Sequence, residues 1–298
     1  MKYFKISILL TVILSIVIFS CDKVDPPYLA DQPEPPDTAA CPIPDFPDIS
    51  NYERIILLEE FTGHTCQNCP EGTLLAHELK EEYGEKLILV SIHAGGFAVP
   101  KPDDPGYEID LRTETGDLLL EEFSASFFPS AMFNRSKINN LWALPTMWWE
   151  GVLDTMMTVG PTIGMQMITD FDDSDRKLCI HIKSKYLQDL SNTLMLSVYI
   201  LEDSIQSAQK NDNPNIGYPT PDIIDYWHNH VLRGPVNNPW GSLVPGSPYL
   251  KDSTLITTFK YFLNDDWKAK HCNVVAFIYD ANTKVVLQAV EAKVIGEE

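Results

Sequence analysis

The segment from residue 54 to residue 92 constrains the fold more than any other part of this 298-residue chain. It begins with the apolar run RIILLEEF (54–61), which is typical of a strand buried on both faces. A helical pattern follows over 71–83, and Gly84 is placed to end that helix. A second apolar strand covers 87–92. This order predicts two parallel strands joined by a helical crossover.

Cys66 and Cys69 lie between the first predicted strand and the helix, and Pro70 fits the first helical turn. The helix dipole and the free N–H groups there favour a thiolate. We therefore expect Cys66, with a lowered pKa, to be the nucleophile and Cys69 to resolve the mixed disulfide. His64 could add positive charge and lower that pKa further, or it could be a solvated loop residue.

Two alternatives exist for the cysteine pair. A structural disulfide closing a tight loop is consistent with an oxidising envelope. Zinc is disfavoured because the chain has no second CxxC pair and its histidines lack ligand-like spacing. The sequence therefore predicts no metal and no cofactor, and it leaves redox-active and structural disulfides open.

The stretch ILLEEFTGHTCQNC resembles the first motif of thioredoxins, and SFFPSAMF (126–133) resembles the cis-proline loop and following strand of that family. The resemblance covers about residues 52–133. It implies that Glu60 is the buried carboxylate that accepts the proton of the resolving cysteine, with a pKa raised by burial. It also implies that Pro129 is a cis residue that faces the cysteines and offers backbone groups to a bound peptide.

The chain departs from the thioredoxin pattern at two places. Thr65 stands where the family has an aromatic residue, and we expect this to open the surface on which a redox partner docks. Residues 95–117 form a long insertion rich in Pro and Gly. A lid, a partner site and a plain surface insertion are the interpretations of that segment.

From about residue 161 the apolar pattern changes to a period of two, over 178–182, 194–200 and 255–261. Residues 274–279 and 285–290 predict a hairpin through the turn at 280–283. Five or more strands without intervening helices predict an antiparallel, immunoglobulin-like β-sandwich.

Further polar residues fall in this second half. Cys179 and Cys272 lie in early and late strands, where an inter-sheet bridge or two unpaired thiols is consistent with the pattern. His228 and His230 would share a face if their segment is a strand. A loop packed on the sheet is favoured there over a metal site.

The N-terminus predicts targeting rather than fold. Residues 1–20 combine a positive flank, a 14-residue apolar run (6–19) and a small residue, as in a secretory signal peptide. That run is short for a membrane span, which needs about 20 residues. Ile-Phe-Ser-Cys resembles the bacterial lipoprotein box, which implies that Cys21 carries lipid such as palmitate. Residues 21–51, rich in Pro and acids, predict an extended tether with Cys41 exposed and unpaired.

The net charge of −20 argues against nucleic acid as a partner and against electrostatic binding to anionic lipid. The predicted organisation is a signal peptide (1–20), a lipidated tether (21–51), an α/β thioredoxin-like domain (52–156) and an all-β immunoglobulin-like sandwich (157–298). Membrane attachment is expected through the N-terminal lipid alone.

Four stretches, LLEEFTGHTCQNCPEG, FPSAMFNR, YWHNHVLRG and CNVVAFIYD, are similar to the Omp28 family of bacterial outer-membrane lipoproteins. This resemblance implies a cell-envelope protein with the two domains predicted above. Two functions stay open. One is a thiol–disulfide oxidoreductase that acts on envelope proteins. The other is a non-catalytic surface module, with the thioredoxin-like fold as scaffold and the sandwich contacting a partner.

Overall fold

The computed structural model describes residues 40–216 and 220–296. The predicted signal peptide, the lipidated Cys21 and the first part of the tether lie outside these ranges. Within them, no helix combines the length and the apolar character that crossing a membrane requires.

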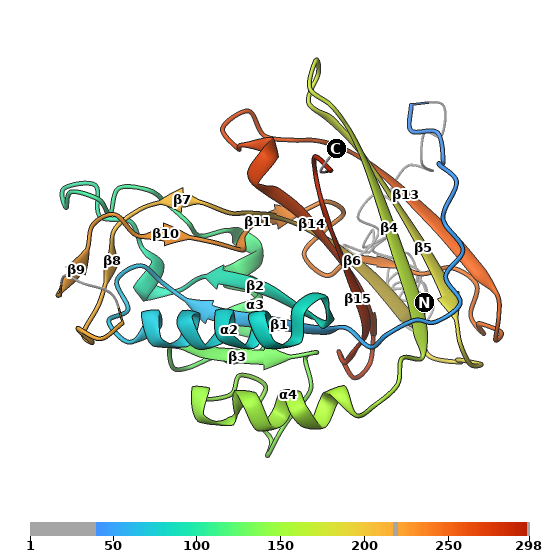
Figure 1. Ribbon diagram of the computed structural model, residues 1–298, viewed down its shortest axis with the longest axis horizontal. Helices are drawn as coiled ribbons and strands as arrows, with labels where there is room; N and C mark the ends of the chain where they lie inside the picture. The colour runs from blue at the N-terminus through green and yellow to red at the C-terminus, as the bar shows by residue number, and fades with distance from the viewer. Residues whose placement is uncertain (1–39, 217–219, 297–298) are drawn as a thin grey trace, which may run out of the picture. The chain divides into compact units, whose positions relative to one another are not determined.

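An eight-stranded sheet is the main element of the fold (Figure 1). β1 (Ile56–Thr62) and β2 (Leu87–His93) pair in parallel, which confirms the prediction from the strand–helix–strand pattern. β3 (Ser130–Phe133) pairs with the other edge of β1 in the antiparallel direction. All residues of these three strands are buried, as expected for strands covered on both faces.

Helices cover the two faces of these strands. α2 (Cys69–Tyr83) and α4 (Trp149–Met157) pack on the side of β1 that presents Ile56 and Leu58. α3 (Glu114–Glu122) packs on the opposite side, where Leu119 joins Leu57 in a second core. The single-turn helices are η2 (Gly84–Lys86), η3 (Gly96–Ala98), η4 (Thr146–Trp148) and η5 (Ala269–His271).

The second half of the chain supplies the remaining long strands. β6 (Leu194–Glu202), β11 (Val231–Pro235), β12 (Ser242–Leu243), β14 (Cys272–Asp280) and β15 (Val286–Lys293) belong to the eight-stranded sheet. Its order is β15-β14-β6-β11-β2-β1-β3, with β12 beside β6. A separate antiparallel sheet contains β4 (Ile163–Asp172), β5 (Lys177–Tyr186) and β13 (Thr254–Phe262). The pairing of β14 with β15 confirms the predicted hairpin.

The eight-stranded sheet contains strands from both sides of the predicted domain boundary. β11 pairs with β6 on one edge and meets β2 at Val231 on the other. One core accordingly includes Val90 of β2 together with Phe277 of β14. Another core lies between the three-stranded sheet and the strands β6, β14 and β15. Strand β11, from the second half of the chain, therefore lies beside the C-terminal end of β2.

Between β6 and β11 the chain leaves the main sheet. Residues 204–216 and 220–230, here called the strap, form two short ribbons. In one ribbon β7 (Ile205–Gln206) pairs with β10 (Trp227–His228), and in the other β8 (Gln209–Lys210) pairs with β9 (Asp222–Ile223). Figure 1 shows both ribbons on the side of the main sheet away from β4, β5 and β13.

The described end of the predicted tether is bonded to the folded part of the protein. Cys41 is 1% exposed and forms a disulfide with Cys179 of β5. Gln166 donates a hydrogen bond to the Pro47 carbonyl at 2.8 Å. The expectation of an exposed, unpaired Cys41 is therefore wrong. Of the two alternatives for Cys179 and Cys272, the bridge between them is wrong, and an unpaired thiol is found for Cys272 alone, which is buried.

The physical reason lies in what covers β5. Side chains of a strand alternate between its two faces, so Cys179 shares a face with His181 and Lys183. The sequence pattern predicts that this face is polar. The structure covers this face with residues 40–47, and Lys183 lies over the Phe46 ring at 5.6 Å. His181 is 1% exposed as a result. Residues 40–47, which their composition predicts to be an extended tether, therefore bury the polar face of β5.

We predict that replacing both Cys41 and Cys179 with Ala lowers the free energy of unfolding by about 2–4 kcal/mol, because the bridge closes a loop of 138 residues. Urea denaturation of the two proteins measures the difference. Asp45→Asn, in the same segment, is the control and should leave stability within about 0.5 kcal/mol of wild type. Equal stability of the double variant and wild type would contradict the assignment.

A buried ion pair connects β1 to strands from the second half. Arg135, just after β3, donates to both carboxylate oxygens of Glu59, at 2.8 Å and 2.6 Å, and both side chains are fully buried. The guanidinium group lies over the rings of Phe277 (4.7 Å), Phe123 (5.2 Å) and Tyr279 (5.6 Å). Burial opposes the charge of Arg135, but Glu59 outweighs it and raises the pKa of Arg135.

We predict that Arg135→Met lowers the free energy of unfolding by about 3–5 kcal/mol, because it leaves the Glu59 carboxylate buried without a partner. The double variant Glu59→Met, Arg135→Met should lose less than Arg135→Met alone. Lys86→Met, which removes the exposed 2.7 Å pair with Glu53, is the control and should cost less than about 1 kcal/mol. Similar losses for the buried and the exposed pair would refute the prediction.

Candidate functional site

Cys66 and Cys69 form a disulfide at the start of α2. Cys69 is the first residue of the helix, and Pro70 lies in its first turn, as the sequence predicts. Cys66 lies in the turn before the helix, where its N–H donates to the Gly63 carbonyl at 3.0 Å. Cys66 is 3% exposed and Cys69 is fully buried. The pair is therefore bonded and largely covered.

Glu60 and Pro129 lie together beside the first turns of α2. The Phe128–Pro129 peptide bond is cis, as the thioredoxin resemblance implies. Both residues approach Gly72 so closely that a Cβ there would lie 2.5 Å from the Pro129 Cβ and 3.1 Å from Oε1 of Glu60. Only glycine allows this approach. The structure thus brings the predicted carboxyl group and proline to the helix end that carries the disulfide.

The Glu60 carboxyl group is protonated at neutral pH. Its side chain lies inside the protein, and burial raises its pKa to about 8, although a hydrogen bond from Thr73 at 3.2 Å lowers it in part. Desolvation disfavours the ionised form of a carboxyl group, which accounts for the direction. This agrees with the expectation from the sequence. Glu60 can hold or release one proton in the pH range where thiols ionise.

The sequence left two interpretations of His64, a positively charged side chain near Cys66 or a solvated loop residue, and the structure agrees with neither. It is fully buried rather than solvated, and burial lowers its pKa, so it is neutral rather than cationic near pH 7. Its Nε2 lies 3.1 Å from the Val99 carbonyl and donates to it. The Tyr107 ring packs edge-on against it at 5.5 Å. His64 therefore places no positive charge beside Cys66.

Two further buried histidines complete a group with His64, here called the histidine cluster. His93 ends β2 and His228 lies in β10, and their ring centroids are 5.1 Å apart. Burial lowers the pKa of His93 well below its usual value and that of His228 to about 3. Within the described ranges, both ring nitrogens of His93, Nδ1 of His64 and Nε2 of His228 have no hydrogen-bond partner.

The histidine cluster was missed in the sequence because its members lie on three separate elements. His230 does not join it and packs instead against His77 at 5.5 Å. His228 and His230 would share a face only in one continuous strand, and that condition is not met: β10 ends at His228, and His230 has a φ of 54°. Across the part of the chain that the structure describes, no three His, Cys, Asp or Glu residues are grouped to hold a metal ion.

The strap lies against the CxxC loop. Gln209 donates from Nε2 to the Cys66 carbonyl at 2.9 Å. The backbone N–H groups of Lys210 and Asp212 donate to the carbonyls of His64 and Gln67, at 2.8 Å and 3.1 Å. These contacts hold the loop from residue 64 to residue 67. No motif marks the strap, and its position follows from the pairing of β6 and β11 in the main sheet.

The insertion at residues 95–117 also contacts the CxxC loop. The backbone N–H and the hydroxyl of Thr65 both donate to the Phe97 carbonyl, at 3.0 Å and 2.8 Å. A Cβ at Gly63 would lie 2.5 Å from that carbonyl, so glycine is required for this contact. Phe97, which is 47% exposed, thus lies beside Thr65, and the expectation that Thr65 opens a docking surface stays a prediction. The insertion is therefore hydrogen-bonded to the CxxC loop.

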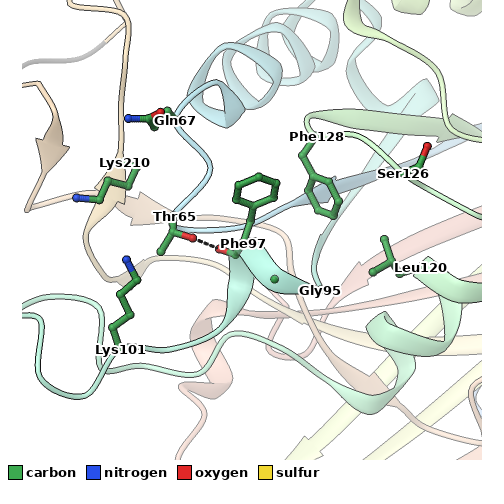
Figure 2. A pocket seen from close by; sticks show the side chains of 10 residues that line it. Thr65, Gln67, Gly95, Phe97, Lys101, Leu120, Ser126, Phe128 and Lys210 are labelled. Atoms are coloured by element: carbon green, nitrogen blue, oxygen red, sulfur yellow. Dashed lines mark hydrogen bonds between the residues drawn. The ribbon is translucent and has the colours of Figure 1, made fainter.

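A cavity of about 500 Å³ lies beside the disulfide loop (Figure 2). Thr65 and Gln67 of the CxxC loop line one part of it, and Ser126 and Phe128 of the cis-proline loop line another. The insertion contributes residues 95–97 and Lys101, α3 contributes Leu120, and the strap contributes Lys210. The cavity therefore lies where the disulfide loop, the cis-proline loop, the insertion and the strap meet.

The family follows from the larger, C-terminal part of the chain. The family model described as "Outer membrane protein Omp28" matches residues 117–298, which is more than half of the sequence. The chain belongs to the Omp28 family. Its predicted location, as an outer-membrane lipoprotein of the cell envelope, is confirmed by this membership. Attachment of lipid at Cys21 stays a prediction.

Two solved structures show related folds at low identity, and a third is similar over a shorter part of the chain. HBP35 of Porphyromonas gingivalis is 16% identical, with a TM-score of 0.59 over 82% of this chain and 76% of its own. A protein from Agrobacterium tumefaciens is 12% identical, with a TM-score of 0.50 over 84% and 98%. A domain of the outer membrane lipoprotein Omp28 from P. gingivalis is 23% identical, with a TM-score of 0.30 over 46% and 92%. The comparison with curated protein sequences found no match.

We predict that this Omp28-family protein loses stability as the pH falls from 7.5 to 5. Each cluster histidine has a folded-state pKa below its unfolded value of about 6.5, so its contribution is present above that value and is lost as the unfolded chain takes up protons. His93→Phe should reduce the loss, as measured by urea denaturation at several pH values. His271→Phe, outside the cluster, is the control. An unchanged pH profile in His93→Phe would refute the prediction.

Proposed function

We propose that this outer-membrane lipoprotein exchanges thiols and disulfides with other proteins of the cell envelope. In this proposal the first half is a thioredoxin-like α/β domain that carries the reaction, and the second half is an immunoglobulin-like β-sandwich. The observation that supports it best is the protonated, buried Glu60 beside the first turns of the helix that begins at Cys69. The cis peptide bond before Pro129, next to the same turn, supports it further.

The exchange starts from the disulfide seen in the structure. A substrate thiolate attacks Sγ of Cys66, a new sulfur–sulfur bond forms, and the Cys66–Cys69 bond breaks. Cys69 leaves as a thiolate and takes the proton of Glu60. A second substrate thiolate then attacks the substrate sulfur of the mixed disulfide and releases Cys66. Two substrate thiols have been oxidised to a disulfide and the protein pair reduced, and the reverse sequence reduces a substrate disulfide.

Each predicted site residue has one role in this scheme. Cys66 is the residue through which the mixed disulfide forms, and Cys69 resolves it. Glu60 supplies and recovers the proton of Cys69, which a pKa of about 8 allows at neutral pH. Pro129 shapes the loop whose Ser126 and Phe128 border the cavity in which a substrate segment lies next to the CxxC loop.

One observation favours a second candidate function. Both cysteines are largely buried, and the strap bonds directly to the loop that holds them. A protected bridge of this kind is consistent with a structural disulfide in a non-catalytic surface module, in which the sandwich contacts a partner. The reduction potential of the Cys66–Cys69 pair distinguishes the two: exchange requires a pair that glutathione-type thiols reduce, and a structural bridge resists them.

We predict that Cys69→Ser, expressed in the envelope, accumulates mixed disulfides through Cys66, because the residue that resolves them is absent. Non-reducing gels followed by identification of the bound proteins measure this. Cys66→Ser, which differs only in the cysteine removed, is the matched control and should accumulate fewer than a tenth as many. Equal amounts in both variants would rule out Cys66 as the exchanging residue.

We predict that Glu60→Gln slows reduction of the purified protein by a small dithiol at pH 7 by about tenfold or more, because Gln cannot donate a proton to Cys69. The wild-type rate, corrected for the fraction of attacking thiolate, should fall as the pH rises through about 8, where Glu60 ionises. The rate of Glu60→Gln should lack this fall. A merely structural role for Glu60 would leave the pH profile unchanged.

Stability of the same variant provides a check that it folds. Because the folded-state pKa of Glu60 lies above its unfolded value, the stability associated with this group is present at low pH and is lost as the pH rises towards 8. Glu60→Gln removes this loss. It should therefore be at least as stable as wild type at pH 8, which separates a slow reaction from a misfolded protein.

A further inference from the structure

The cavity beside the disulfide has one apolar wall. The rings of Phe97 and Phe128 pack at a tilt of 57° with centroids 5.5 Å apart, and Leu120 also lines this wall. Figure 2 shows the two rings side by side in the centre of the view. Phe97 is about half exposed. An apolar or aromatic side chain that enters the cavity would bury this exposed surface, which is the main source of affinity in such sites.

The other wall carries positive charge. Lys101 of the insertion and Lys210 of the strap both lie over the Tyr107 ring, with Nζ at 5.9 Å and 5.3 Å from its centroid. In Figure 2 both lysines lie on the side of Thr65 away from Phe128 and Leu120. Tyr107 is 1% exposed and so offers a fixed platform. One buried aromatic ring thus holds two ammonium groups at the rim of the cavity.

Of the two lysines at this rim, Lys210 is paired with a carboxylate. Asp222 forms an ion pair with Lys210 at 2.6 Å and accepts a hydrogen bond from Tyr107 at 2.5 Å. Burial opposes ionisation of Asp222, but these two bonds and the charge of Lys101 lower its pKa, so it is a carboxylate at neutral pH. Among the residues that the structure describes, no carboxylate forms an ion pair with Lys101. Lys101 is therefore the rim ammonium group without an ion-pair partner in this part of the structure, although Asp104 also lies near the Tyr107 ring.

The unpaired Lys101 matters because the chain as a whole is strongly acidic, with a net charge of −20. An acidic segment is repelled by most of the protein and attracted at the lysine rim, so binding elsewhere is disfavoured. A basic segment would be attracted to many places on the surface but repelled beside the disulfide. The charge at the lysine rim therefore favours acidic segments over basic ones at the cavity.

We propose that the cavity binds an extended segment of a substrate protein in which an acidic residue neighbours an apolar or aromatic residue. The acidic side chain pairs with Lys101, near Lys210, and the apolar side chain packs on Phe97 and Phe128. This inference rests on the proposed thiol–disulfide exchange, because it places the substrate cysteine next to Thr65 and Gln67 of the CxxC loop. It adds the substrate class, which the exchange reaction alone leaves open.

Peptide binding to the whole purified protein tests the inference without the redox step. Three fluorescein-labelled octapeptides are compared, with Ser in place of Cys, one Phe, and next to it Glu, Gln or Lys. Fluorescence anisotropy should show the Glu peptide binding at least fivefold more tightly than the Gln peptide, and the Lys peptide more weakly than both. The Glu preference should decrease as salt is raised from about 50 to 300 mM, because the contact is electrostatic.

Variants of one residue assign the preference. Lys101→Gln should bring the Glu and Gln peptides to within twofold of each other, and Lys101→Glu should invert the order of the Glu and Lys peptides. Lys251→Gln, an exposed lysine in the strand-rich half, changes the net charge equally and should leave the preference unchanged. Equal binding of the Glu and Lys peptides to wild type, or no binding of any peptide, would overturn the inference.

Cysteine-containing forms of the same peptides distinguish the proposed exchange reaction from the proposed selectivity for acidic segments. Faster mixed-disulfide formation with the Glu peptide, in the Cys69→Ser variant, supports both the exchange and its selectivity. Tight binding of the Glu peptide without any exchange supports the acidic-segment site and rejects the redox function. Exchange at the same rate for all three peptides, with equal binding, supports the redox function and rejects the proposed selectivity.

Discussion

The buried pair of Arg135 and Glu59 is the interaction on which the position of the candidate site depends. A buried charge without its partner is costly, so the two side chains must meet wherever the chain folds. Glu59 lies on the face of β1 that meets Phe277 and Tyr279, and Glu60 is directed to the opposite face, beside α2. A shift of β1 by one residue would exchange these two carboxyl groups. The ion pair thus fixes the register that places a protonated carboxyl group beside the helix of the disulfide.

The site is assembled from both halves of the chain. The disulfide and Glu60 come from the first βαβ unit, whereas Gln209 and Lys210 come from the strap between β6 and β11. Because the family match begins at residue 117, it includes Pro129 and the strap but not the two cysteines. Membership of the Omp28 family therefore supports location, and the redox proposal depends on the geometry around Cys66, Cys69 and Glu60.

The sequence predicted local features well and long-range contacts poorly. The βαβ unit follows from patterns within a few residues, where period and helix ends act locally. The cis residue at Pro129 and the raised pKa of Glu60 were implied by the resemblance to thioredoxins. The partner of Cys179 was missed because nothing in the alternation of β5 indicates that residues 40–47 cover it. The contact of Gln209 with Cys66 joins residues 143 positions apart, which no periodicity can reveal.

Burial of the disulfide also limits what can react with it. The strap and the insertion both contact the CxxC loop, and Cys66 is only 3% exposed. The flat surface of a folded partner therefore has little access to Cys66. The adjacent cavity of about 500 Å³ admits a few side chains of an extended strand instead. A protein that has not yet folded is extended in this way, and its cysteines are still exposed. For the proposed exchange, this geometry favours substrates that are unfolded near the reacting cysteine, and the lysine rim would distinguish among them by the charge of neighbouring residues.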